Sequence, residues 1–276
     1  MNTDLNYIYI TNKPEIGNAI AQLGVKWIMI DLEINGKNAR QSGRNTVISG
    51  HSRNDVQKMR LALRDPKLLV RVNPMGPNSE EEINSVISAG ANAIMLPYFS
   101  CRLEVENFIE IVNKRSRVFL LLETLKGIEE LDNILSLAGI DFVHIGLNDL
   151  HIQRKTKFMF EFLTDGALEP VVESLKKYNI PFGIGGVGKL GHLVPTPERI
   201  LTEHIRVGSS GVILSRSFLN QNNYDNAQNF IRDFKLEFGK MTEFVSSLQG
   251  KSPEFFLDNR ETLISEIATV AKNFNS

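Results

Sequence analysis

Short runs of apolar residues recur along the chain, and they alternate with segments in which apolar positions repeat at helical spacing. Runs that are short and almost continuously apolar are typical of strands buried on both faces of a parallel sheet. The strands predicted in this way are Tyr7–Ile10, Trp27–Ile30, Leu68–Val70, Ala93–Leu96, Val118–Leu122, Phe142–Ile145, Phe182–Ile184 and Ile205–Val207.

The segments between these strands are predicted to be helices, for example Pro14–Leu23, Asn54–Leu63, Ser79–Ala89 and Arg102–Asn113. Ser79 followed three residues later by Glu82 predicts a capping box, and Gly90 predicts the end of the same helix. Eight strands that alternate with helices indicate an α/β protein. They favour a (β/α)8 TIM barrel over a doubly wound sheet.

Two further helices, Asp225–Leu248 and Pro253–Phe274, are predicted after the eighth strand. A barrel needs only one helix there, so the last is expected to cap the barrel or to pack on a neighbouring subunit. We therefore expect a barrel domain over residues 1–222 and a C-terminal helical extension over residues 223–276. The segment Gly250–Glu254 is the expected hinge between the two helices.

Composition narrows the class of protein. The 31 Lys and Arg residues nearly balance the 32 Asp and Glu residues, so no excess of positive charge points to nucleic acid or to a membrane surface. The single cysteine, Cys101, excludes an intramolecular disulfide framework and suits a reducing compartment. The N-terminus does not resemble a signal peptide, and the apolar runs are too short to span a membrane. We expect a cytoplasmic protein.

In a barrel of this kind the chemistry lies where strands end and the following loops begin. Polar side chains directly follow several predicted strands, namely Asp31, Glu33, Arg71, Asn73, Glu123, Asn148 and Asp149. Because neighbouring strands lie about 4.8 Å apart, Glu123 and Asp149 are expected to share one ion. Two carboxylates suit a hard cation such as Mg²⁺ or Mn²⁺. The alternative is that both acids only stabilise the N-termini of the helices that follow them.

The run LLETLKGIEELDNILSLAGIDFVHIGLNDL (Leu121–Leu150) resembles the core of the HpcH/HpaI aldolase and citrate lyase β family. This family belongs to the phosphoenolpyruvate/pyruvate barrel superfamily. The ET…G and G-x-N-D-L elements carry the resemblance. It continues in the same order through Trp27–Glu33, Val70–Pro74, Gly90–Ser100 and Val207–Leu219.

The resemblance implies a metal-dependent (class II) aldolase or another carbon–carbon lyase, acting on a 2-oxo acid such as pyruvate or oxaloacetate. Glu123 and Asp149 would bind Mg²⁺ or Mn²⁺, and Arg71 would contact the keto oxygen. Metal and guanidinium would together stabilise an enolate. The substrate carboxylate would be held by the backbone N–H groups of Gly146, Leu147 and Asn148. The family also implies a homo-oligomer, a hexamer built as a trimer of dimers, with the C-terminal helix exchanged between subunits.

The chain departs from the family at the general base. The aldolase branch has a His–Asp dyad, and the corresponding positions here are Ile34 and Ser88. The substitutes that the sequence offers are Glu33, His51, His151 or a metal-bound water. Arg71 also has a plainer interpretation, a structural ion pair with Glu123 or Glu33.

Two alternative functions therefore stay open. The segment DLE…K..AR (Asp31–Arg40) resembles the citrate lyase branch, although Ile34 interrupts its DLED pattern, and this favours a citrate- or acyl-CoA-type lyase or synthase. The missing dyad favours a barrel that binds a metal and an oxo acid without catalysis.

Glycines near the last two predicted strands suggest a second kind of site. Gly185–Lys189 and Gly208–Gly211 are expected to form the loops after strands seven and eight, where barrels often bind phosphate through backbone N–H groups. The simpler interpretation, which we favour, is that small residues only make room for the substrate beside the metal. His144, inside the sixth strand, is predicted to be a packed core residue.

Overall fold

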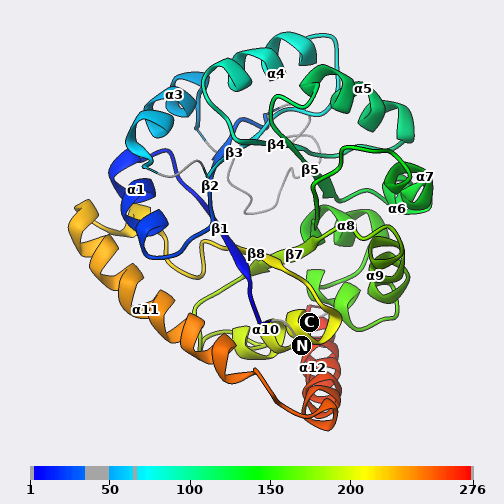
Figure 1. Cartoon of the computed structure of the whole chain (residues 1–276). Helices are drawn as coiled ribbons and strands as arrows, with labels where there is room; N and C mark the ends of the chain where they lie inside the picture. The colour runs from blue at the N-terminus through cyan, green and yellow to red at the C-terminus, as the bar shows by residue number, and fades with distance from the viewer. Residues whose placement is uncertain (1–2, 35–49, 65–66, 275–276) are drawn as a thin grey trace. The chain divides into compact units, whose positions relative to one another are not determined.

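The computed structural model describes residues 3–34, 50–64 and 67–274 of the chain. Eight parallel strands are hydrogen-bonded in sequential order in a closed barrel, with helices between successive strands (Figure 1). The predicted (β/α)8 fold with extra C-terminal helices is therefore confirmed. By its internal contacts the chain divides into two compact units, residues 8–143 and residues 1–7 with 144–276.

The unit of residues 8–143 contains most of the first five strands and the helices that connect them. Its strands are β1 (Asn6–Ile10), β2 (Trp27–Asp31), β3 (Leu68–Arg71), β4 (Ala93–Leu96) and β5 (Arg117–Leu122). Its helices are α1 (Pro14–Gln22), α3 (Arg53–Ala62), α4 (Ser79–Ser88), α5 (Arg102–Val112), α6 (Leu125–Glu129) and α7 (Leu131–Leu135). All five residues of β2 are buried, as expected of a strand that is covered on both faces.

The start of α4 differs from the prediction. Asn78 is the N-cap, and Ser79 is the first helical residue. The Ser79 hydroxyl accepts a hydrogen bond from the N–H of Gly76, and Glu82 accepts hydrogen bonds from Asn73. The capping box is therefore wrong, because both of its side chains serve the loop that precedes the helix. Gly90 follows the end of α4 with a φ of +97°, as predicted for a helix stop.

The unit of residues 1–7 and 144–276 contains the rest of the barrel and the C-terminal helices. After β6 (Phe142–Ile145), its strands are β7 (Phe182–Val187) and β8 (Gly211–Leu214). Its helices are α8 (Leu147–Arg154), η1 (Met159–Leu163), α9 (Leu168–Lys177), α10 (Pro197–Val207), η2 (Gln221–Asn223), α11 (Ala227–Ser247) and α12 (Pro253–Asn273).

The predicted eighth strand is wrong. Ile205–Val207 is the last turn of α10, which ends at Gly208 with a φ of +83°, and the strand β8 lies four residues further on at Gly211–Leu214. The apolar residues Ile205 and Val207 belong to the buried face of a strongly amphipathic helix. A short apolar run does not by itself distinguish a buried strand from the buried face of a helix.

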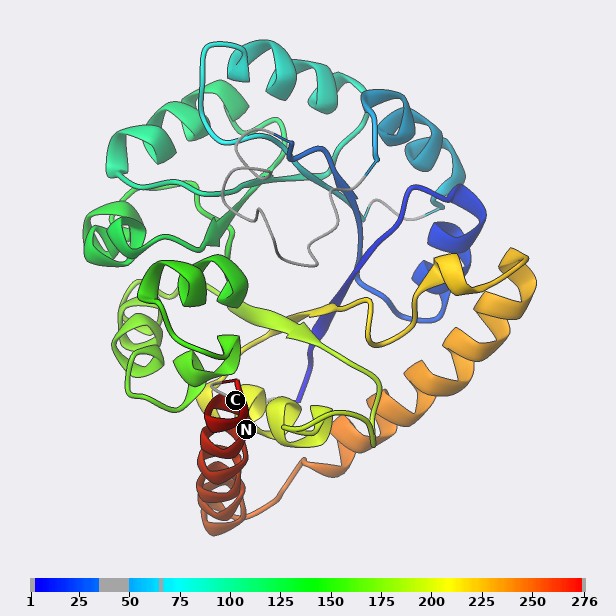
Figure 2. The ribbon, with the colours of Figure 1, turned by 180° about the vertical axis from the view of Figure 1, so that it is seen from behind.

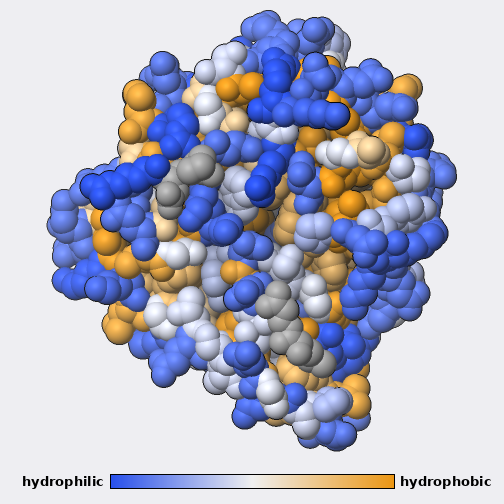
Figure 3. Space-filling view, viewed as in Figure 1, coloured by the Kyte–Doolittle hydropathy of each residue, from blue (hydrophilic) through white to orange (hydrophobic). Residues whose placement is uncertain are grey.

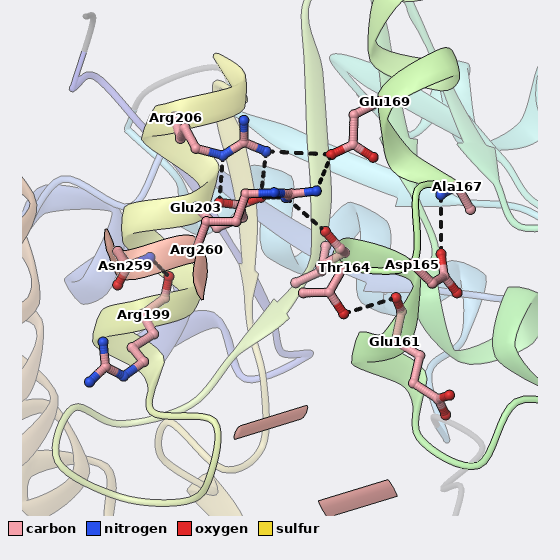
Figure 4. Close-up of polar contacts among 11 residues, drawn as sticks. Glu161, Thr164, Asp165, Ala167, Glu169, Arg199, Glu203, Arg206, Asn259 and Arg260 are labelled. Carbon is pink, nitrogen blue, oxygen red and sulfur yellow. Dashed lines mark hydrogen bonds and ion pairs between the residues drawn. The ribbon is translucent and has the colours of Figure 1, made fainter. Parts of the chain in front are cut away.

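The last helix packs on α10 of the same chain, as the views from both sides show (Figures 1 and 2). Figure 4 shows the polar part of this contact. Arg260 of α12 donates to Glu203 of α10 at 2.5 Å and also bonds Glu169 of α9. Asn259 donates to the backbone oxygen of Arg199. The boundary at residues 222 and 223, and the exchange of α12 between subunits, stay predictions.

The visible face in Figure 3 is largely hydrophilic, with hydrophobic residues scattered among the polar ones. Among the helices that the structure describes, none is both long enough and apolar enough to cross a membrane.

Candidate active site

The ends of β2 and β3 bring one guanidinium between two carboxylates. Asp31 and Arg71 are paired in the parallel register, so their side chains project to the same face of the sheet. Nε and Nη2 of Arg71 donate to Oδ1 and Oδ2 of Asp31, each at 2.8 Å. Nη1 of Arg71 lies 3.3 Å from Oε2 of Glu33. The predicted site residues Arg71 and Glu33 are therefore in contact.

The charges around Arg71 are mostly negative. Burial alone would lower the pKa of Arg71, but the charge and hydrogen bonds of Asp31, followed by the charges of Glu33 and Glu123, outweigh it and raise the pKa above its ordinary value. The side chains of Asp31 and Glu33 are each only 2% exposed. Three carboxylates thus act on one guanidinium, an arrangement that favours the binding of a cation in addition to Arg71.

Glu123 directly follows β5 and is held by the loop after β4. The backbone N–H of Tyr98 donates to Oε1 of Glu123 at 3.1 Å. Tyr98 has a φ of +52°, a left-handed conformation that costs energy in a residue other than glycine and that clusters at functional sites. The side chain of Glu123 is buried, and one of its oxygen atoms has a fixed position.

Thr124 and Gly127, the other two residues of the ET…G element, also contact the loop after β4. Thr124 caps α6, since its hydroxyl accepts the N–H of Gly127 at 2.9 Å and donates to the backbone oxygen of Phe99 at 2.6 Å. A Cβ atom at Gly127 would lie 2.8 Å from the Thr124 hydroxyl and 3.1 Å from that oxygen of Phe99. Only glycine leaves room for these contacts, so the spacing of Glu123, Thr124 and Gly127 has a packing reason.

The other predicted ligand lies at the start of α8. Gly146 is the N-cap of this helix, and Leu147, Asn148 and Asp149 form its first turn. The first N–H groups of a helix have no partner within the helix and attract anions. The side chain of Asp149 is buried. The structure thus places Gly146–Asn148 at a helix N-terminus, and the use of this backbone for a carboxylate stays a prediction.

Leu147 packs against Gly185 of β7. Gly185 has a φ of +44°, and a Cβ atom there would lie 2.6 Å from Cδ1 of Leu147. Gly185 therefore makes room for the first turn of α8. The space at Gly185 is filled by Leu147, so the interpretation that small residues make room for the substrate stays a prediction.

One of the two loops predicted to bind phosphate, Gly208–Gly211, does not follow the eighth strand. Gly208–Ser210 precede β8, and Gly211 begins it, so this glycine segment lies at the opposite end of the strand from the loop that was predicted. Residues Gly185 and Gly186 lie inside β7, which continues to Val187 through a register shift. Only the short segment from Gly188 onward follows that strand.

His151 lies on α8, two residues after Asp149. Residues at this spacing project in different directions from a helix. Nδ1 of His151 lies 3.1 Å from the backbone oxygen of Thr156, and because a carbonyl oxygen only accepts, Nδ1 is the donor. The lone pair of the neutral ring is then on Nε2, as a general base would require.

The two positions of the family's dyad lie on different elements, Ile34 after β2 and Ser88 in α4. Ile34 is 53% exposed, and its N–H donates to Oδ1 of Asn73, in the loop before α4. Ser88 is the last residue of α4 and is exposed. An isoleucine side chain cannot transfer a proton, so these two positions cannot act as the family's dyad. The Lys37 and Arg40 positions of the DLE…K..AR pattern lie outside the described residues.

Three other histidines have structural contacts. His144 is buried in β6 with Nε2 at 2.9 Å from the backbone oxygen of Gly185, so its prediction as a packed core residue is confirmed. Burial, followed by the charge of His144, lowers the pKa of His204 to about 3. His51 lies next to Ser52, the N-cap of α3, and its Nδ1 accepts the N–H of Asp31.

The sequence did not indicate two of these relationships. Asp31, rather than Glu33 or Glu123, is the main partner of Arg71. Its spacing of two from Glu33, which keeps both acids on one face of an extended strand, is the signal that could have identified it. The left-handed backbone of Tyr98 has no signal in the sequence.

The side chains predicted to bind Mg²⁺ or Mn²⁺ carry the type of ligand atom that these ions prefer. Glu123 and Asp149 supply hard carboxylate oxygens on buried side chains. Within the described ranges, no group of three or more His, Cys, Asp and Glu side chains is placed to hold a metal. A site built on two carboxylates would therefore need oxygen atoms from water or substrate, as Mg²⁺ sites commonly do.

The sequence model of the family described as HpcH/HpaI aldolase/citrate lyase matches residues 9–179, well over half of the chain. A search of curated proteins gives no match.

Solved structures resemble the chain over most of its length. One is a protein of the same family from Burkholderia cenocepacia, with 15% identity and a TM-score of 0.62, covering 85% of this chain and 96% of that one. Another is the citrate synthase SbnG, with 15% identity, a TM-score of 0.57 and coverage of 88% and 95%. A third is the citrate lyase β subunit from M. tuberculosis, complexed with oxaloacetate and magnesium. It has 16% identity, a TM-score of 0.56 and coverage of 79% and 96%. At these identities the likeness concerns the fold.

Proposed function

Because the chain belongs to the HpcH/HpaI aldolase/citrate lyase family, we propose that it is a divalent-metal-dependent carbon–carbon lyase acting on a 2-oxo acid such as pyruvate or oxaloacetate. The observation that carries the proposal is the placement of Arg71 at the end of β3, held by Asp31 and Glu33 and under the charge of Glu123. A packing role alone would not require four charged groups at the ends of strands, where this fold carries its chemistry.

Each residue has a role in this proposal. Glu123 and Asp149 would hold Mg²⁺ or Mn²⁺, which supplies fixed positive charge to the substrate oxygens. Arg71 donates to the keto oxygen, where negative charge develops as the carbon–carbon bond breaks. The backbone of Gly146, Leu147 and Asn148 binds the substrate carboxylate. Oxaloacetate and magnesium in the related citrate lyase β subunit support the choice of ligand class.

Proton transfer requires a group other than the dyad, whose positions are Ile34 and Ser88 in this chain. His151 directs the lone pair of Nε2 away from its contact with Thr156 and is one candidate for the base. Glu33 is a second candidate, although its carboxylate is engaged by Arg71. His51 and a metal-bound water are the other two groups that the sequence offers. A homo-oligomeric assembly and a cytoplasmic location stay predictions.

Two further activities have specific support. Citrate synthase and citrate lyase are among the solved structures of this fold, which favours a thioester or citrate-type substrate. The exposed Ile34 at the position of the family's base favours a barrel that binds an oxo acid without turning it over. A panel of aldehydes and acyl-CoA thioesters, tested with a saturating 2-oxo acid and Mg²⁺, separates these activities from an aldolase.

The first experiment is calorimetric binding of oxalate, an analogue of the pyruvate enolate, with and without Mg²⁺ or Mn²⁺. We expect binding that requires the metal and that Glu123→Gln and Asp149→Asn abolish. Glu129→Gln, a substitution at an exposed acid of α6, is the matched control and should bind normally. Oxalate binding that is equally strong without metal would contradict the ion site. The absence of binding under all conditions would contradict the proposed function.

A further inference from the structure

His51 makes a contact that has a direct bearing on Arg71. It lies just before α3, next to the N-cap Ser52, and its ring is half-buried. Nδ1 of His51 accepts a hydrogen bond from the backbone N–H of Asp31 at 3.0 Å. Asp31 is the residue whose carboxylate receives both parallel hydrogen bonds of Arg71.

The direction of the Asp31 N–H shows where the His51 ring lies. The N–H groups of Ile28 in β2 and of Leu32 just after it point to the β3 side, where they bond the oxygens of Lys67 and Arg71. Successive residues of a strand direct their N–H groups to opposite sides, so the odd-numbered residues of β2 face β1. The bond from the N–H of Thr11 to the oxygen of Met29 shows this. Asp31 is odd-numbered, and its N–H therefore also points to the β1 side. His51 therefore accepts the hydrogen bond of the Asp31 N–H in place of a β1 backbone carbonyl. This contact lies where β1 and β2 end and their backbone pairing stops.

This contact selects one form of the imidazole ring. A backbone N–H only donates, so Nδ1 must carry a lone pair and the proton of the neutral ring is on Nε2. In the imidazolium both ring nitrogens carry protons, and two N–H groups would then oppose each other. Protonation of His51 is therefore incompatible with the bond to Asp31.

The charged groups near His51 come from three elements. On β2 and beyond it lie Asp31 and Glu33, and on β3 lies Arg71, which repels an imidazolium. On α3, Asp55 attracts one, and its carboxylate accepts the N–H and hydroxyl of Ser52. Burial alone would raise the pKa of Asp55, but the hydrogen bonds of Ser52 and Asn12, followed by the positive charge of a protonated His51, lower it. From the β1 side Asn12, which is uncharged, reaches Asp55 at 3.5 Å. Asp55 therefore offers a protonated His51 a partner other than Asp31.

We infer that His51 is a positioning residue for Arg71, and that it holds the end of β2 only while its ring is neutral. The neutral ring fixes the backbone of Asp31, and Asp31 in turn fixes the guanidinium and, through Oδ1, the N–H of Glu33. A protonated ring turns from Asp31 to Asp55, and the end of β2 loses one hydrogen bond. The consequence for ligand binding rests on the proposed function, in which Arg71 contacts the oxo acid.

Three substitutions test this inference by metal-dependent oxalate binding at about pH 8 and at about pH 5.5, on either side of the range in which histidines ordinarily change charge. The wild type should lose affinity about tenfold at the lower pH, the scale set by one hydrogen bond. In His51→Asn the side-chain oxygen stands near the place of Nδ1 and does not titrate. This variant should recover most of the affinity that His51→Ala loses, without the loss at low pH. His51→Gln extends past that place and should resemble His51→Ala at both pH values.

Ring-nitrogen NMR of His51 gives a readout that does not depend on the ligand. At about pH 8 the lone pair should be on Nδ1, and the Asp31 amide should be protected from hydrogen exchange in the wild type and His51→Asn but not in His51→Ala. A proton on Nδ1 would overturn the inference, as would a His51→Asn variant with the pH profile of the wild type. If the wild type does not bind oxalate, the proposed function fails, and the NMR and exchange results still decide the role of His51.

Discussion

Arg71 and Asp31 form a bidentate pair in which Nε donates to Oδ1 and Nη2 donates to Oδ2, both at 2.8 Å. This geometry uses two edges of a planar guanidinium at once, and a lysine ammonium does not reproduce it. The pair is also sheltered, since the side chain of Asp31 is 2% exposed and that of Arg71 is 14% exposed. Arg71 keeps a third nitrogen directed to Glu33.

The first prediction concerns Arg71→Lys. We expect oxalate affinity to fall about a hundredfold and the free energy of unfolding to fall by about 2 kcal/mol, because two buried carboxylates lose their shared partner. Calorimetry and urea unfolding measure the two effects. Arg53→Lys is the control, since Arg53 and Glu81 form an exposed ion pair, 48% and 78% accessible, and should change stability by less than about 0.5 kcal/mol. Oxalate affinity within threefold of the wild type would contradict this role of Arg71.

The second prediction uses two glycines in helices. Gly127→Ala should lower the free energy of unfolding by about 1–3 kcal/mol, because its Cβ lies 2.8 Å from the Thr124 hydroxyl. It should also weaken metal-dependent binding, since Thr124 follows Glu123 directly. Gly239→Ala, in α11, has no atom within 4 Å of the added Cβ and should stabilise the protein by about 0.5–1 kcal/mol. Equal effects of the two substitutions on stability would show that the packing at Gly127 is not restrictive.

The third prediction concerns the attachment of α12. Arg260→Gln should destabilise the unit of residues 1–7 and 144–276 by about 1–3 kcal/mol, because Glu203 is only 1% exposed and loses one of its two cationic partners. It should also speed protease cleavage between α11 and α12. Arg232→Gln, at an arginine of α11 that is 70% exposed, is the control and should change stability by less than about 0.5 kcal/mol. Cleavage at an unchanged rate in Arg260→Gln would argue that other contacts hold α12.

The fourth prediction is a pH dependence of stability from His204. Burial and the neighbouring His144 lower the pKa of His204 to about 3, whereas an unfolded histidine titrates near ~6.5. Between these values the unfolded chain binds more protons, so this histidine's contribution to stability is complete above ~6.5 and is lost as the pH falls. From about pH 7 to about pH 5 the free energy of unfolding should fall by about 2 kcal/mol from this residue.

Urea unfolding of the wild type and of His204→Gln at both pH values isolates the contribution of His204. Between about pH 7 and about pH 5, the free energy of unfolding of the variant should fall by about 2 kcal/mol less than that of the wild type. His192→Gln, at an exposed histidine, controls for a general effect of removing an imidazole and should retain the slope of the wild type. If the free energy of unfolding changed with pH in the same way in all three proteins, protonation of His204 would not destabilise the folded state, and the prediction would be wrong.

Seven of the eight strands could be predicted from apolar runs because each is buried on both faces and is followed by a polar or glycine-rich loop. The eighth could not, because β8 begins with Gly211 after two serines, whereas Ile205–Val207 is apolar for a different reason. Packing of α10 buries these residues on one side of a helix. A run of three positions is too short to show the difference between the two periods.

The sequence by itself determined the barrel, the strand ends that carry charge and the family, because each depends on local spacing and on residues close together in the chain. Only the tertiary structure decided which groups meet. Arg71 forms its two parallel hydrogen bonds with Asp31, forty positions earlier in the chain, whereas the sequence suggested an ion pair with Glu123 or Glu33. Arg260 takes Glu203 and Glu169, and the Asp31 amide selects the tautomer of His51. These contacts join residues that are distant in sequence, and their geometry follows from strand register and helix packing, which local patterns do not specify.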